Sequence, residues 1–333
     1  MTPVAPGHRT NHAMAYDQAR GVTVLFGGDR GSPLNDTWEW DGSVWSSRPA
    51  FGPATREEHA MAYDSARGVT VLFGGRDRQY FNDTWDWVGT SWSRRATSGP
   101  SPRRGHAMIY DSARGVTVLF GGYNYDDGDQ RYGDTWEWDG RAWSLRATTG
   151  PGPRYAHAMA YDSVRGVTVL FGGHDDRWNG ETWEWDGVVW TQRETTGPSA
   201  RSEHAMSFDN ARGVAVLFGG RDGRINRETW EWDGSAWALR ANSGPDATEE
   251  HAMVYDCARS ATVLFSGSDG PSTSETWEWD GAAWSKRATK GPYGRFGHSM
   301  AYDKARGVTV LFGGNFYIYY TPHPFGDTWA WDG

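Results

Sequence analysis

Seven histidines stand at a fixed place in a repeated segment, and histidine is the side chain best suited to proton transfer or metal binding near neutral pH. Each opens a His-Ala-Met-Ala-Tyr-Asp segment or a close variant. The seven are His12, His59, His106, His157, His204, His251 and His298. No His-x-His or Cys-His spacing accompanies them, so the pattern does not indicate a metal site. One imidazole per repeat indicates a structural role, with hydrogen bonds to backbone atoms between repeats.

A second set of side chains could bind an anion. An arginine stands three residues before the histidine in six of the seven repeats, and Thr248 replaces it in the other. The six are Arg9, Arg56, Arg103, Arg154, Arg201 and Arg295. Arranged around an axis, their guanidinium groups would form a ring suited to an acidic peptide or another anion. Glutamates such as Glu57 and Glu203 interleave with them, so the arginines could instead brace loops through ion pairs.

Aromatic side chains gather in the segments that do not repeat. Twenty of the 21 tryptophans occupy repeated positions, and Trp178 is the exception. The aromatic candidates for ligand binding are Tyr80, Phe81, Tyr125, Tyr132, Tyr155, Trp178, Phe316, Tyr317, Tyr319 and Tyr320. Exposed Tyr and Trp are typical anchors for proteins and sugars, so these segments are predicted to bind a ligand.

The sequence gives little support for catalysis, phosphate binding, calcium binding or disulfide formation. No Ser/His/Asp constellation, phosphate-binding loop or spaced carboxylate pair stands out. Asp126, Asp127 and Asp129 do not match a calcium-loop pattern. The single cysteine, Cys257, excludes an internal disulfide. The sequence therefore predicts no enzyme, no cofactor and no metal.

The repeat sets the fold. Successive histidines are 47 residues apart, except for one interval of 51. Each repeat continues through Gly-Val-Thr-Val-Leu-Phe-Gly-Gly, a variable stretch, Asp/Glu-Thr-Trp-Glu-Trp-Asp-Gly and a further Trp. These segments have the β-branched and aromatic content of four short strands joined by Gly-rich turns.

One four-stranded unit has two apolar faces and cannot bury both alone, whereas a radial array buries each face against a neighbour. We therefore expect an all-β, seven-bladed propeller with four-stranded antiparallel blades. It would fill residues 1–333 as one domain, with first strands beginning at about 12, 59, 106, 157, 204, 251 and 298.

The Gly-Gly doublet, the aromatic third strand and the Trp that follows it resemble the kelch repeat, and most closely the Trp-rich kelch-type repeats of bacteria. The resemblance implies a protein-binding propeller. Kelch propellers that bind acidic peptides use arginines at a similar position. Some kelch-type propellers, such as galactose oxidase, are enzymes that need a Cys cross-linked to a copper-ligand Tyr. Cys257 falls in a turn on the opposite face, so that activity is not carried over.

The seventh repeat lacks its outer strand, because the sequence reaches Gly333 before the segment that would form it. Three outcomes are open. Blade 7 could have three strands, residues 1–5 could supply a fourth, or a strand-donating or self-associating partner could supply it.

Only one face of the propeller is predicted to vary. The loop between the second and third strands has seven residues before the acid in five repeats, eleven in the third and twelve in the seventh, whereas the turns on the other face are nearly identical. Loops that diverge on a constant framework are typical of a recognition surface. We therefore expect a non-enzymatic module that binds a protein or peptide through the variable-loop face. The alternatives are carbohydrate binding and an assembly unit that uses the open edge of blade 7.

Charge and hydropathy argue against two further classes of protein, those that bind nucleic acid and those that insert into a membrane. The net charge of −9 argues against nucleic-acid binding, which needs a basic surface. The sequence contains no apolar stretch of about 18 residues, so it does not predict membrane insertion. The first ten residues lack the apolar core of a secretory leader, and the sequence assigns no compartment.

Overall fold

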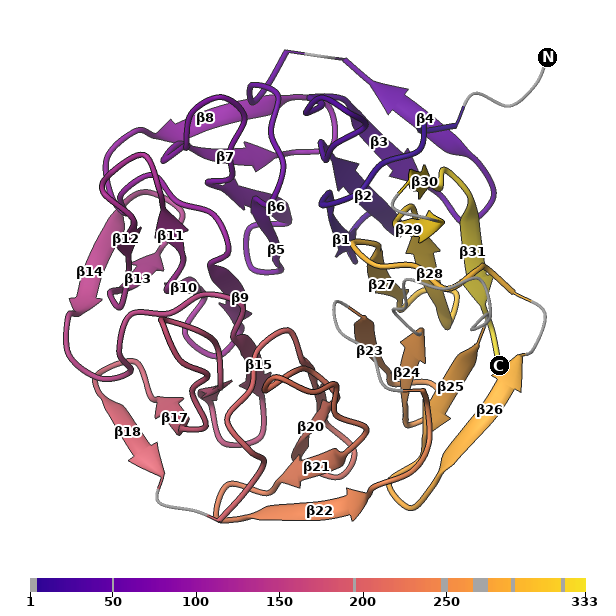
Figure 1. Cartoon of the computed structure of the whole chain (residues 1–333). Helices are drawn as coiled ribbons and strands as arrows, with labels where there is room; N and C mark the ends of the chain where they lie inside the picture. The colour runs from indigo at the N-terminus through magenta and orange to yellow at the C-terminus, as the bar shows by residue number, and fades with distance from the viewer. Residues whose placement is uncertain are drawn as a thin grey trace.

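The seven repeats fold as seven small antiparallel sheets arranged around a central axis (Figure 1). The computed structural model describes residues 5–49, 51–193, 196–246, 251–265, 275–288, 291–318 and 321–333. Strands and turns account for the secondary structure of these ranges, and no helix that could span a membrane occurs within them. The all-β, seven-bladed propeller expected from the sequence is confirmed.

The first strand of each blade lies nearest the axis. These strands are β1 (Ala13–Asp17), β5 (Ala60–Asp64), β9 (Ala107–Asp111), β15 (Ala158–Asp162), β19 (Ala205–Asp209), β23 (Ala252–Asp256) and β27 (Ser299–Asp303). The second strands are β2 (Val22–Phe26), β6 (Val69–Phe73), β10 (Val116–Phe120), β16 (Val167–Phe171), β20 (Val214–Phe218), β24 (Ala261–Phe265) and β28 (Val308–Phe312). Each first strand lies beside that of the next blade, and β27 lies beside β1, so the ring closes.

The third strands are β3 (Thr37–Trp40), β7 (Thr84–Trp87), β13 (Thr135–Trp138), β17 (Thr182–Trp185), β21 (Thr229–Trp232), β25 (Thr276–Trp279) and β31 (Thr328–Trp331). The outer strands are β4 (Trp45–Arg48), β8 (Trp92–Ala96), β14 (Trp143–Ala147), β18 (Trp190–Arg193), β22 (Trp237–Ala241) and β26 (Trp284–Ala288). The two long variable loops form small hairpins, β11 (Tyr123–Asn124) with β12 (Gln130–Arg131) and β29 (Asn315–Ile318) with β30 (Thr321–Pro324).

The Gly-Gly doublet holds neighbouring blades together. In blade 2, Gly74 and Gly75 have φ values of 71° and 87°, a region that side chains rarely adopt. The Gly75 N–H donates to the carbonyl of Arg103 in blade 3, at 2.9 Å. A Cβ atom on Gly74 would lie 2.8 Å from that same carbonyl oxygen. The doublet is therefore required by the close approach of the next blade.

Tryptophan fills the outer part of each interface. Trp87, Trp138, Trp185, Trp232 and Trp279 are at most 1 % exposed. The Trp that opens each outer strand packs edge-on against a phenylalanine of the preceding blade, as Trp92 does on Phe26 at 5.1 Å. Burying each indole contributes roughly 2–4 kcal/mol before entropy, at about 25 cal/mol per Å².

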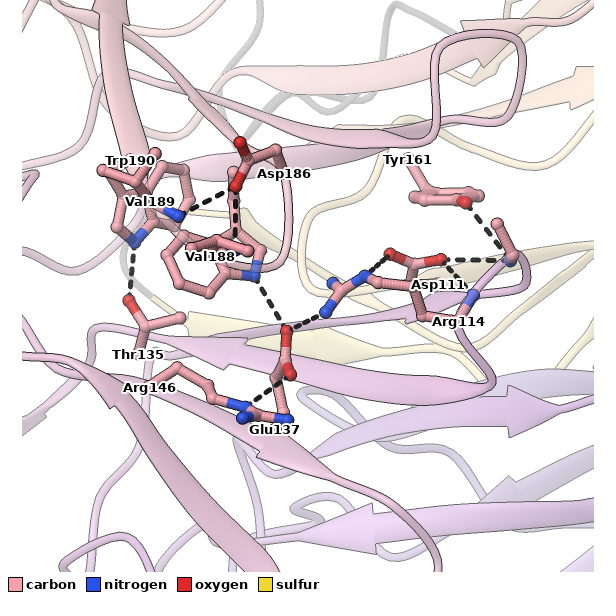
Figure 2. Close-up of polar contacts among 12 residues, drawn as sticks. Asp111, Arg114, Thr135, Glu137, Arg146, Tyr161, Asp186, Val188, Val189 and Trp190 are labelled. Carbon is pink, nitrogen blue, oxygen red and sulfur yellow. Dashed lines mark hydrogen bonds and ion pairs between the residues drawn. The ribbon is translucent and has the colours of Figure 1, made fainter.

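Polar contacts recur at five of the seven interfaces on the face of the near-identical turns, and Figure 2 shows one of them. Glu137 accepts hydrogen bonds from Arg114 and Arg146 of its own blade and from Trp185 of the next. Arg114 also pairs with Asp111, at 2.7 Å. The arginines of these turns thus join carboxylates within and between blades. Cys257 is exposed in the turn between β23 and β24, on this same face.

The strand histidines pack among aromatic rings, where six of them are buried and His106 is half-buried. His59 lies edge-on to Phe26 of the preceding blade at 5.4 Å, and the other six pack in the same way. The expected backbone hydrogen bond is seen for His251, whose Nε2 donates to the Phe218 carbonyl at 3.1 Å. Burial, together with the nearby Arg103 charge, lowers the pKa of His106 to about 3. The imidazole of His106 is therefore neutral at physiological pH.

Blade 7 has three strands among the described residues, in the order β27-β28-β31. Residues 1–4, which the sequence offered as part of a substitute strand, lie outside the described ranges, and Ala5 is not in a strand. The ring is nevertheless joined between blades 7 and 1, since Gly314 N–H donates to the Arg9 carbonyl at 2.9 Å.

Candidate functional site

The variable loops share one backbone arrangement despite their different sequences. In blade 2 the end of the loop is hydrogen-bonded to the Gly-Gly doublet, because the Phe81 N–H donates to the Gly75 carbonyl at 2.9 Å. The Phe81 carbonyl then accepts from the N–H of Arg103 in blade 3, at 3.2 Å. Among the described residues, the loops of blades 1, 2, 3, 4 and 7 are attached to the following blade in this way, and their outer residues are the ones that differ.

The six arginines do not form an exposed ring. Each is at most 1 % exposed and pairs with the carboxylate that precedes a third strand. Arg103, for example, donates to both carboxylate oxygens of Asp134 at 2.6 and 2.9 Å and to the Gly121 carbonyl at 3.0 Å. The hypothesis of a cationic ring is corrected, because these charges are buried and already neutralised. Their contacts are those of loop bracing.

Two of the candidate aromatics cover these arginines. The guanidinium carbon of Arg56 lies 4.1 Å from the centre of the Phe81 ring, and that of Arg103 lies 3.9 Å from the centre of Tyr132. Tyr132 is only 9 % exposed. Phe325, which the sequence analysis did not single out, covers Arg295 in the same way at 3.9 Å. These rings cover buried ion pairs, and Phe81 and Phe325 remain half-buried.

An axial cavity of about 840 Å³ opens between the variable loops, at the end of the central channel. Described residues of six blades contribute to its lining. Charged and polar side chains come from His8, Asp29, Arg30, Glu58 and Glu203, and aromatic side chains come from Tyr123, Tyr155 and Phe296. Of the sixteen candidates from the sequence, Tyr155 lines this cavity directly.

The lining includes residues with left-handed backbone conformations. Asn11, Glu58, Ala156 and Glu203 have φ values between 52° and 59°, and each directly precedes a strand histidine. The Glu58 N–H donates to the Asn11 carbonyl at 3.0 Å, and the Asn11 N–H to the Gly297 carbonyl at 3.1 Å. In Asn11, Glu58 and Glu203 this conformation directs the backbone N–H to a carbonyl of the preceding blade. The sequence analysis missed these residues, although glycine stands at the same place in two repeats, as Gly105 and Gly297.

An aromatic track leads outward from the cavity over blades 3 and 4. We use this name for Tyr123, Tyr125, Tyr155, His174 and Trp178. The ring of Tyr123 lies 4.5 Å from Tyr155 and 4.7 Å from Tyr125, Tyr155 lies 5.5 Å from His174, and His174 lies 5.9 Å from Trp178. The outer members are accessible, with Tyr125 48 % and Trp178 38 % exposed.

The charges beside the track are paired. Arg104 bonds to Glu58 at 2.5 Å, and its guanidinium carbon lies 4.8 Å from the centre of Tyr123. Burial raises the pKa of the Glu58 carboxyl above its ordinary value, although the charge of Arg104 opposes the shift. On the opposite side of the cavity, burial and the charge of Arg30 lower the pKa of His8. The site thus offers both acceptors and donors rather than one sign of charge.

The remaining aromatic candidates lie elsewhere. Tyr80 is half-buried and bridges to Arg76 through its backbone. Phe316 stacks on Phe325 at 5.1 Å in blade 7. Tyr317 is in β29, and Tyr319 and Tyr320 lie outside the described residues. Within the part of the chain that the structure describes, no three His, Cys, Asp or Glu side chains are placed to hold a metal ion.

The opposite end of the channel offers a contrast. A cavity of about 580 Å³ there is lined by the repeated Met, Ala and Tyr residues of the first strands. Its lining is nearly the same in every blade, whereas the lining of the axial cavity differs from blade to blade. Any selective recognition by this fold is therefore favoured at the variable-loop end.

The seven radial sheets, the glycine doublets and the arginine-braced loops define a β-propeller of repeated blades. A family model described as the KLHDC2/KLHL20/DRC7 Kelch-repeats domain matches residues 1–139 and 84–243. The two matches together span well over half of the sequence, and the chain belongs to the kelch-repeat family.

No curated protein matches the sequence. Among solved structures, one named "Structure of YjhT" is similar with a TM-score of 0.64 and 14 % sequence identity, over 86 % of this chain and 99 % of that one. At this identity the similarity concerns the fold alone.

Proposed function

We propose that this protein is a non-enzymatic binding module that takes up a peptide segment of another protein at the axial cavity. The observation that supports this most strongly is the continuity between the cavity and the aromatic track, because Tyr155 belongs to both. A cavity of about 840 Å³ lies within the usual range for ligand sites. The track extends it outward, so an elongated ligand could place one residue in the cavity and others on the rings.

The lining favours a peptide through its mixture of groups. Glu58 and Asp29 provide acceptors, Arg30 and His8 provide donors, and Tyr155 provides an apolar surface. Such alternation suits a backbone with varied side chains better than a purely anionic ligand. The burial of the six arginines removes the main reason to expect an acidic peptide.

Carbohydrate binding is the second candidate, and the accessible rings of Tyr125 and Trp178 favour it. Sugars stack their apolar faces on such rings, and the polar neighbours could bind hydroxyl groups. A peptide display library and a glycan array, both probed with the same purified protein, distinguish the two candidates.

Variants of the lining residues test whether a selected ligand binds at this site. We expect a Tyr155→Ala, Trp178→Ala double variant to bind the selected ligand at least tenfold more weakly, with an unchanged melting temperature. Gln18→Ala is the matched control, because Gln18 is exposed at the opposite end of the channel. Binding that survives the double variant but is lost with Gln18→Ala would place the site on the other face and refute the proposal.

A further inference from the structure

A pocket of about 510 Å³ lies on the outer side of blade 2, away from the central axis. It is bounded by the segment that joins blade 1 to blade 2 (residues 52–54), by the end of the variable loop of blade 2 (residues 79–83), and by β7 and β8, the outer half of that blade (Figure 1). Among the described residues, it shares no lining residue with the axial cavity. Its volume falls within the usual range for small-molecule sites.

Arg94 brings a positive charge to this pocket. It stands opposite Trp85 in the register of β7 and β8, and its guanidinium carbon lies 6.0 Å from the centre of the Trp85 ring. Among the described residues Arg94 forms no ion pair. The acid of the lining, Asp83, is already neutralised by Arg56, which donates to its two carboxylate oxygens at 2.8 and 3.1 Å. The described lining therefore carries one positive charge that nothing balances.

The other described outer strands leave no such charge at the matching position. The residues that stand opposite the first Trp of their third strand are Ser47, Leu145, Gln192, Leu239 and Lys286. Lys286 is the one other cation of this set, and it pairs with Glu275. Because serine, leucine and glutamine serve the blade equally well, the repeated framework does not require the arginine of blade 2.

A second departure from the repeat borders the same pocket. Phe51 directly precedes Gly52 of the lining and is 92 % exposed, the largest exposed fraction among the described large hydrophobic side chains. The matching residues of the other joining segments are Ser98, Thr149, Thr196, Ser243 and Lys290. An aromatic ring in water is unfavourable, and such rings are enriched where a ligand binds. Two residues that only blade 2 and its joining segment carry thus stand at one pocket.

The rest of the lining supplies hydrogen-bonding groups and a ring face. Asn35, Gln79 and Asn82 carry carboxamides, and each carboxamide offers both donors and an acceptor. Tyr80, one of the aromatic candidates from the sequence, lines the pocket and is half-buried. Carboxamides orient a polar ligand without selecting its charge, so the guanidinium of Arg94 decides which sign of charge the pocket accepts.

We propose that this pocket binds a small organic anion in which a carboxylate or phosphate group adjoins a flat ring. Arg94 binds the anionic group, because the parallel N–H donors of a guanidinium match two oxygens of a carboxylate or phosphate. Tyr80 and Phe51 contact the ring, and the carboxamides bind its polar substituents. The site is on a different surface from the axial cavity, so the proposal can fail while the proposed function holds, and the reverse.

Benzoate and phenyl phosphate are the probes, and benzyl alcohol is their neutral counterpart. Ligands of this size bind proteins in about the millimolar range, which saturation-transfer NMR measures. We expect at least one of the two anions to bind about tenfold more tightly than benzyl alcohol, because a charge-assisted hydrogen bond to Arg94 is lost with the charge. The tighter anion identifies the group as carboxylate or phosphate. If neither anion binds more tightly than benzyl alcohol, the proposal is wrong.

A pair of variants localises the anion. Arg94→Gln should weaken the tighter probe about tenfold and leave the melting temperature nearly unchanged, because Gln192 occupies the same position in blade 4. Lys286→Gln is the matched control, since it removes the equivalent cation of blade 6, which Glu275 already neutralises. It should leave binding of the probe unchanged. If Arg94→Gln binds the probe as well as the parent protein does, or if both variants weaken it equally, the anion does not bind in this pocket.

The variant Phe51→Ser tests the contact with the ring of the ligand. Serine stands at the matching position of two other joining segments, as Ser98 and Ser243, so the fold tolerates it. We expect the tighter probe to bind several-fold more weakly, whereas acetate and methyl phosphate, which carry the same anionic groups without a ring, should lose less than about twofold. Unchanged binding of the probe, or an equal loss for the anions with and without a ring, would overturn the aromatic part of the proposal.

Discussion

The indole N–H of Trp45 in blade 1 donates to Oγ1 of Thr328 in blade 7, at 2.6 Å, and joins residues 283 positions apart in the chain. The same bond links Trp92 to Thr37 between two consecutive blades, at 2.7 Å. Tyr16 adds a second contact across the closure, because its hydroxyl accepts from the Ala305 N–H at 3.0 Å. The joint between the first and last blades is therefore built from the same contacts as the internal joints.

The first prediction concerns that joint. Trp45→Phe removes the donor to Thr328 and should lower the free energy of unfolding by about 1–3 kcal/mol, from the lost hydrogen bond and the lost contact area. Trp284→Phe removes the matching bond between blades 5 and 6. Urea unfolding should show similar losses for both variants. A much larger loss for Trp45→Phe would mean that closure depends on this bond more than the internal joints do.

The second prediction concerns the buried arginines. Arg103→Met leaves the Asp134 carboxylate without its partner, and removing one member of a buried ion pair costs about 3–5 kcal/mol. Arg141→Met alters an exposed arginine of a turn and should change stability by less than about 0.5 kcal/mol. Thermal unfolding of both proteins compares the two sites. Equal stability of the two variants would contradict the bracing role.

The third prediction is a gain in stability. Blade 2 has Asp86 where five other blades have Glu, and both the Trp138 Nε1 and the Asp86 Oδ1 lack a hydrogen-bond partner. In the next blade the longer Glu137 receives Trp185 at 2.9 Å. Asp86→Glu should supply the missing acceptor and add about 1 kcal/mol. The gain should disappear when Trp138→Phe is introduced as well, which a double-mutant cycle measures.

The fourth prediction concerns pH. Burial, followed by the charge of a neighbouring arginine, lowers the pKa of His12, His106 and His157 to about 3. An unfolded histidine has a pKa near 6.5, so between about pH 6.5 and 3 the unfolded chain binds more protons. Stability is therefore fully present above about pH 6.5 and is lost as the pH falls. Each such histidine should cost about 2 kcal/mol at pH 5.

The variant His106→Gln isolates one of these groups. Its loss of unfolding free energy between pH 7 and pH 5 should be smaller than that of the parent protein by about 2 kcal/mol. Urea titrations at both pH values measure the difference. An identical pH dependence in the two proteins would show that His106 is not buried in its neutral form.

The sequence predicted the fold well because the fold depends on what repeats. The Gly-Gly doublets, the paired tryptophans and the spacing of the histidines each report a contact that every blade makes. The accessibility of Arg103 could not be deduced in this way. Its partner Asp134 lies 31 residues further on, beyond a loop of variable length, and only folding brings the two together.

The site was harder to predict for the same reason. Tyr155 and Trp178 were found because they interrupt the repeat, but their connection through His174 depends on how two loops fold back on blade 4. The left-handed backbone conformations of Glu58 and Ala156 cannot be recognised from a single sequence, except through the glycines at the matching positions of other repeats.

The equivalence of the closing joint and the internal joints has an evolutionary consequence. Each of the first six repeats carries both halves of its interface, so a duplicated or deleted repeat of about 47 residues brings its own contacts with it. New blades need no compensating change in their neighbours, and the same property permits circular permutation at any of the turns between repeats. Copy number and starting point can thus drift while the blade itself stays constant.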